Sequence, residues 1–155
     1  MSRLTDTLRH VVISPELLGI LVVFSCFYFA PSAFDFPTKH LGEGIGFGLG
    51  AAGIASGCLA FCYQEGAAIL EPSGTGRVLL DWPGYFMLKN RVIAAMCWCV
   101  FGVGGALAAT WLVASGVGAN IGAALLVASL LASVVSLASI ALARLRIREI
   151  LQANS

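Results

Sequence analysis

Long runs of apolar residues, separated by short polar segments, dominate the pattern of this chain. About 20 consecutive apolar residues are needed to cross the hydrocarbon core of a bilayer as an α-helix. The runs therefore predict four transmembrane helices, over residues 14–34, 41–66, 91–115 and 117–143. Apolar residues occupy all sides of these helices, as expected where lipid and other helices surround them. We expect an all-α integral membrane protein that forms a single transmembrane domain over residues 1–155.

The start of the first span carries a strong helix-initiation signal, the sequence Ser14-Pro15-Glu16. Serine is a favoured N-cap, proline is favoured at the first helical position, and an acid near the N-terminus interacts favourably with the helix dipole. With Arg3 and Arg9 before it, the same region resembles a secretory signal peptide. Its removal would leave the N-terminus on the wrong side of the charge pattern, so we interpret the span as a retained anchor.

Composition supports the membrane assignment and narrows the functional classes. Hydrophobic residues make up 59% of the chain and charged residues only 11%, with a mean hydropathy of +0.92. A soluble domain has about 25% charged residues, because its surface faces water. The net charge of +1 gives no broad basic surface, so we expect no direct contact with nucleic acid.

The distribution of basic residues predicts the orientation of the chain in the membrane. Of the nine Lys and Arg residues, only Lys39 falls in a segment predicted on the opposite side from the others. The positive-inside rule makes the arginine-rich side cytoplasmic. Both termini are then cytoplasmic, and we expect a multi-pass protein of a bacterial inner or plasma membrane. The cytoplasmic pieces are an amphipathic segment over residues 1–13, a loop over 71–90, and a tail over 144–155 that extends the fourth helix.

Ionisable residues are scarce inside the predicted spans. Glu16, Glu43 and Glu65 lie near span ends, and His10 and His40 lie in flanking segments. We expect the three glutamates to be solvated at the membrane interface, with a pore-lining role left open for the second and third. The residues that proton-coupled transport, voltage sensing or haem ligation would need are missing from mid-bilayer. No catalytic constellation is present either, so we expect neither an enzyme nor a cofactor.

Five cysteines raise the question of redox or metal chemistry. Cys58 and Cys62 are four residues apart and share a helical face, and Cys97 is expected at a similar depth on the third span. Zinc sites usually combine a C-x-x-C spacing with further Cys or His ligands, and that pattern is missing here. We therefore interpret the cysteines as small hydrophobic residues and expect no metal or redox site.

Small residues recur along one face of the second span. In lipid, helices associate through close packing across small residues rather than through the hydrophobic effect. The fourth span carries serines near one face, whose hydroxyls can bond within or between helices. Packing inside one four-helix bundle and packing between subunits both remain open. For a homo-oligomer, the expected packing residues are Gly46, Gly50, Gly53, Gly57, Ser129, Ser133 and Ser136.

The loop over residues 71–90 mixes aromatic and charged side chains. Such a mixture is typical of residues at the headgroup level, where the segment would rest on lipid. The alternative is a protein–protein interface, whose core favours aromatic residues, Met and Arg. For the second interpretation, the expected partner-binding residues are Arg77, Asp81, Trp82, Tyr85, Phe86 and Lys89.

These patterns favour a non-enzymatic scaffold or sensor subunit that forms a homo-oligomer and recruits a cytoplasmic protein. A small pore-forming or transporter subunit is the alternative, and a membrane enzyme ranks last. Nearly all of the sequence outside the spans is predicted to be cytoplasmic, which is the reason for this order. For such a subunit we expect a bacterial signalling or antiviral-defence system, a setting that no residue identifies.

Overall fold

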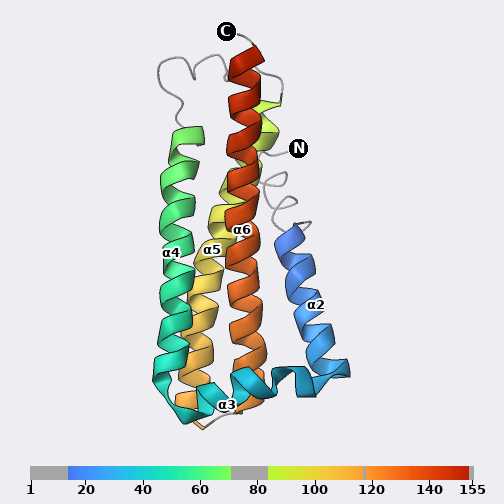
Figure 1. Cartoon of the computed structure of the whole chain (residues 1–155), viewed down its shortest axis with the longest axis vertical. Helices are drawn as coiled ribbons and strands as arrows, with labels where there is room; N and C mark the ends of the chain where they lie inside the picture. The colour runs from blue at the N-terminus through green and yellow to red at the C-terminus, as the bar shows by residue number, and fades with distance from the viewer. Residues whose placement is uncertain (1–13, 71–83, 117, 154–155) are drawn as a thin grey trace, which may run out of the picture.

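The computed structural model describes residues 14–70, 84–116 and 118–153, and every element in these ranges is helical (Figure 1). The elements are α2 (Pro15–Phe29), the 3-10 helix η1 (Pro31–Phe34), α3 (Asp35–Glu43), α4 (Ile45–Leu70), α5 (Tyr85–Ala114) and α6 (Ala119–Ala153). The predicted N-terminal segment 1–13 lies outside the described residues.

The described residues contain three helices that are long and apolar enough to cross a membrane, namely α4, α5 and α6. A fourth span is possible if the pair α2 and η1–α3, which bends by 115°, is counted as one. With a rise of 1.5 Å per residue, α2 is about 22 Å long and α6 about 52 Å, against a hydrocarbon core of about 30 Å. The chain is therefore a multi-pass integral membrane protein.

The first predicted span is shorter than expected and ends in a bend. The Ser14 cap is confirmed, because its side chain accepts a hydrogen bond from the Leu17 amide. The helix stops at Phe29, two residues before Pro31. The chain then runs as η1 and α3 beneath the ends of the other helices (Figure 1). The expectation of a helix through residue 34 was wrong, because proline lacks the amide hydrogen that a continuing helix would need.

The connections around the other spans also differ from the prediction. α4 begins at Ile45 rather than residue 41, because the preceding residues belong to α3, which ends at Glu43 with Gly44 as its C-cap. α5 begins at Tyr85, so the last part of the predicted loop 71–90 is helical. The turn from α5 to α6 contains Gly116 and Gly118, whose φ angles of 78° and 85° favour glycine. The expected helical tail is confirmed, since α6 continues to Ala153.

The three long helices pack against one another, and α2 packs mainly against α6 (Figure 1). The core between them is built largely from small side chains, with Ala55, Ala94, Ala95, Ala106 and Ala109 fully buried. Small residues let helix backbones approach closely, which is how helices associate in lipid. The start of α2 is directed toward the end of the bundle where α6 ends, although α6 extends well beyond it (Figure 1). We call this end the arginine-rich end because Arg91, Arg144, Arg146 and Arg148 lie toward it along α5 and α6.

Candidate functional site

A buried ion pair lies at the arginine-rich end, between α2, α5 and α6. Arg91 Nη2 donates to both carboxylate oxygens of Glu16, at 2.7 Å and 3.0 Å. The same nitrogen donates to Ser139 Oγ at 2.8 Å, and Ser136 Oγ donates to Glu16 Oε1 at 3.3 Å. We call these four residues the polar cluster. It ties the first turn of α2 to the two long helices beside it.

The expectation that Glu16 would be solvated was wrong, because its side chain is 0% exposed. A buried carboxylate is costly unless it is paired and hydrogen-bonded. Here the carboxylate is stabilised by hydrogen bonds from Arg91 and Ser136. It also lies in the first turn of α2, where the helix dipole favours negative charge. The N-cap Ser14, which is also buried, fixes the backbone that carries it.

A second ion pair joins α4 to α6 at the same end. Arg144 Nη1 donates to Glu65 Oε1, and the side chain of Arg144 is 46% exposed. Glu65 is thus an ion-pair partner at the rim of the bundle. At the opposite end, Glu43 Oε2 lies 3.0 Å from His40 Nδ1, and both side chains are exposed.

Two cysteines meet inside the bundle. The sulfur atoms of Cys62 on α4 and Cys99 on α5 are 3.3 Å apart, both residues are fully buried, and both are free thiols. The sequence suggested Cys97 as the neighbour of the α4 cysteines, but the structure brings Cys99 to that position. They lie in an apolar cluster with Ile69, Val92 and other side chains from the three long helices. This contact joins α4 to α5, as packing of small hydrophobic residues does.

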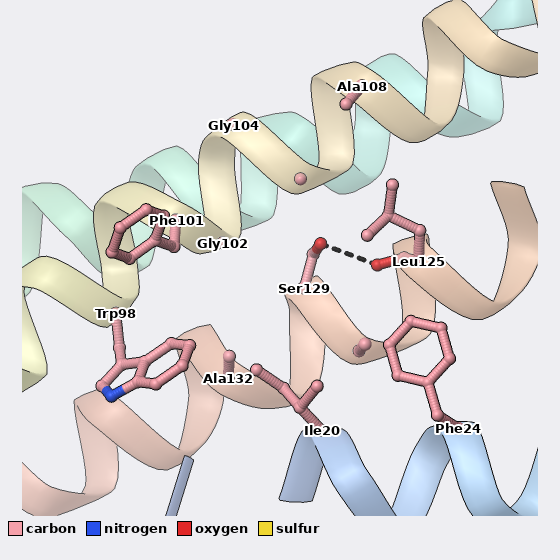
Figure 2. A pocket seen from close by; sticks show the side chains of 12 residues that line it. Ile20, Phe24, Trp98, Phe101, Gly102, Gly104, Ala108, Leu125, Ser129 and Ala132 are labelled. Atoms are coloured by element: carbon pink, nitrogen blue, oxygen red, sulfur yellow. Dashed lines mark hydrogen bonds between the residues drawn. The ribbon is translucent and has the colours of Figure 1, made fainter. Parts of the chain in front are cut away.

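An apolar groove of about 450 Å³ lies between α2 and α5, with α6 as its floor (Figure 2). Ile20 and Phe24 of α2 face Trp98 and Phe101 of α5 across it. On the floor, the Ser129 hydroxyl donates to its own helix, to the Leu125 carbonyl at 2.7 Å. The groove therefore presents an apolar lining, suited to lipid chains rather than to polar substrates.

The glycines of α4 divide into a packed face and a vacant face. A Cβ atom at Gly48 would overlap the Thr110 hydroxyl and lie 2.8 Å from its methyl group, and one at Gly66 would overlap Met96. In contrast, a Cβ atom would meet nothing within 4 Å at the four glycines of α4 that were predicted to pack between subunits. We call these four residues the vacant glycine face: Gly46, Gly50, Gly53 and Gly57.

The three serines of α6 that were predicted to pack between subunits make their contacts within the chain instead. Ser133 and Ser136 are fully buried, and Ser129 is 5% exposed. A Cβ atom at Gly102 of α5 would overlap the Ser133 hydroxyl and lie 3.0 Å from the Ser129 carbonyl oxygen. This face of α6 thus packs on α5 of the same chain, and the subunit-packing expectation rests on the glycines.

The predicted partner-binding residues are only partly described. Arg77, Asp81 and Trp82 lie outside the described residues. Tyr85 begins α5, and its hydroxyl is within hydrogen-bonding distance of the Ile69 and Leu70 carbonyl oxygens, at 3.2 Å and 3.0 Å. It therefore satisfies carbonyl groups at the end of α4.

The remaining two residues lie on the first turns of α5. Phe86 is 44% exposed, whereas Lys89 is half-buried. Phe86 is the described residue of the predicted set that offers a large apolar surface to a partner.

Sequence reasoning missed the pairing of Glu16 with Arg91. A usable signal was present, since the predicted topology places the starts of the first and third spans at the same end of the bundle. Opposite charges next to two spans at one end are candidates for an ion pair.

Comparison of the chain with known protein families, with characterised proteins and with solved structures found no match.

Proposed function

We propose that this chain is a non-enzymatic scaffold or sensor subunit of a bacterial inner or plasma membrane. It assembles with copies of itself through the vacant glycine face of α4 and recruits a cytoplasmic protein through residues 71–90. The arginine-rich end is cytoplasmic in this proposal, in agreement with the positive-inside rule.

The vacant glycine face is the observation that carries the proposal. On the same helix, side chains of α5 occupy the space beside Gly48 and Gly66. Within the described residues, nothing comes within 4 Å of a Cβ atom placed on the vacant glycine face. Glycine in a membrane helix is useful where another backbone comes close. A second copy of the chain supplies such a backbone, and lipid does not.

The partner-recruiting part of the proposal has its support in the chemistry of residues 71–90. Aromatic and arginine side chains carry most of the binding energy at protein interfaces. The Tyr85 hydroxyl already contacts carbonyl oxygens at the end of α4, so we expect Trp82 and Phe86 to be the anchors of the interface. Phe86 lies at the start of α5 with 44% of its surface exposed.

The pore-forming alternative receives less support from the bundle interior. The hydroxyls of Ser129, Ser133 and Thr110 donate to carbonyl oxygens one turn earlier on their own helices, at 2.7 Å, 3.0 Å and 2.8 Å. All three residues are buried between packed helices. Hydroxyls satisfied in this way line helix contacts rather than a path for ions.

The assembly is tested by replacing Gly46, Gly50 and Gly53 together with leucine. Each side chain enters open space in the single chain, so the fold is retained, while bulk on this face holds a second copy away. Native mass spectrometry of the purified protein then shows a smaller subunit count. Gly104→Leu is the matched control, because Gly104 of α5 also has nothing within 4 Å of a Cβ atom. An unchanged subunit count in the folded triple variant contradicts the proposal.

Partner recruitment is tested with Trp82→Ala combined with Phe86→Ala. Affinity purification from the native host, read by quantitative mass spectrometry, compares this variant with wild-type protein and with Phe101→Ala. Phe101 is 64% exposed on the same helix, within the membrane span. The proposal requires a soluble protein that wild type and Phe101→Ala retain and the double variant loses. Equal recovery by all three contradicts it.

A further inference from the structure

We propose that the groove between α5 and α6 at the arginine-rich end binds an anionic phospholipid. This site is separate from the vacant glycine face, and it does not depend on the proposed assembly. The groove has a volume of about 470 Å³, and its lining includes Met87, Leu88, Arg91, Leu142, Arg146 and Ile147.

The position of the groove suits a lipid. It is bounded by two membrane-spanning helices at the level where the first basic residues of each appear. Met87 and Leu142 are 69% and 64% exposed, so apolar surface faces outward at its mouth. Arginines next to apolar surface at a span end mark the boundary between acyl chains and headgroups.

The described residues balance only one of the two arginines in the groove. Glu16 pairs with Arg91, and Glu65 pairs with Arg144 outside the groove. Arg146 is exposed and makes no ion pair with the described residues. The three hydrogen bonds that Arg91 donates to Glu16 and Ser139 all come from Nη2, and among the described residues no bond from its Nε or Nη1 is seen. Counted over the described residues, the groove therefore carries about one uncompensated positive charge and guanidinium donors in excess of the carboxylates.

A phospholipid with net negative charge fits both halves of this description. Guanidinium groups bind phosphate oxygens through paired, charge-assisted hydrogen bonds. An acyl chain of the same molecule covers the apolar lining, which a free phosphate ion would leave exposed. Basic pockets between transmembrane helices are a recurrent way of binding such headgroups.

Binding at this position also bears on the polar cluster. Arg91 lines the groove and holds Glu16 of α2, so a phosphate that contacts Arg91 restricts the same guanidinium that fixes the start of α2. The lipid is then expected to strengthen the attachment of α2 to the bundle.

The experiment measures binding of phosphatidylglycerol and phosphatidylcholine to the full-length protein in detergent, by native mass spectrometry over a lipid titration. Wild-type protein is expected to bind phosphatidylglycerol at least about fivefold more tightly, the contribution of one basic residue near a headgroup. Arg146→Gln is expected to lose about that factor. Arg148→Gln is the matched control, because Arg148 is exposed on the same helix and outside the groove lining.

Two further measurements distinguish binding of the lipid in the groove from a general attraction of anionic lipid to the basic residues. Leu142→Trp fills the groove without changing any charge, and it is expected to weaken phosphatidylglycerol binding while the helical circular dichroism is retained. Glycerol phosphate, which has no acyl chain, is expected not to displace the lipid. The proposal is overturned by equal binding of the two lipids, by equal loss in Arg146→Gln and Arg148→Gln, by full binding in Leu142→Trp, or by displacement with glycerol phosphate.

Discussion

Replacing Glu16 with alanine tests the polar cluster. In Glu16→Ala, the Arg91 guanidinium keeps Ser139 as its partner but loses both carboxylate oxygens. Removing one member of a buried ion pair costs about 3–5 kcal/mol of folding free energy, because the other charge is left uncompensated. The Arg91 side chain is 25% exposed, so it can turn partly toward headgroups or water. We therefore expect a loss near the lower end of this range, about 3 kcal/mol.

The matched control is Glu65→Ala. Its partner Arg144 is 46% exposed, and exposed ion pairs contribute about 0–1 kcal/mol. Both variants remove one glutamate from a pair at the same end of the bundle. Reversible unfolding in mixed micelles of mild detergent and dodecyl sulfate, followed by circular dichroism, gives the two free-energy differences. If Glu16→Ala loses no more stability than Glu65→Ala, the buried pair does not hold α2 in place and the reasoning is refuted.

Three further predictions concern helix packing. Gly102→Ala is expected to destabilise the fold by about 1–3 kcal/mol in the same unfolding assay, because the new Cβ lies 3.0 Å from a carbonyl oxygen of α6. Gly53→Ala is the control, since its Cβ meets nothing within 4 Å, and it is expected to leave the stability of the fold unchanged. Tyr85→Phe removes a hydroxyl contact with the end of α4 and is expected to cost about 1 kcal/mol, and no measurable loss would argue against that contact. Cys62 and Cys99 are expected to resist a small membrane-permeant thiol-alkylating reagent in the folded protein, whereas the exposed Cys26 reacts; alkylation of all three at the same rate would contradict the buried contact between Cys62 and Cys99.

The long helices and one helix start could be predicted from the sequence, because they depend on local properties. Three apolar runs are long enough to span a bilayer whatever they pack against. The Ser14 cap needs only its own helix, since the bond goes to the amide of Leu17. The helical continuation of α6 past residue 143 likewise follows from an uninterrupted run of helix-forming residues.

The features that escaped prediction depend on how helices meet. Glu16 is buried because α2 packs on α6 and Arg91 of α5 reaches its carboxylate, which the first span by itself does not reveal. Gly48 and Gly50 lie two residues apart on α4 and so point to nearly opposite sides of it, and α5 packs only against the first. Spacing separates the two faces of α4, but which face packs on α5 is a property of the bundle and could not be predicted from spacing alone.

The vacant glycine face as a contact between chains is tested most directly by cross-linking in native membranes. In a background with the five native cysteines replaced by alanine, Gly53→Cys places a thiol on this face, and Gly104→Cys places one on α5 away from it. Oxidation is expected to give a covalent dimer of the Gly53→Cys protein and to leave the Gly104→Cys protein monomeric. No dimer at position 53, or equal dimer at both positions, would contradict assembly through α4.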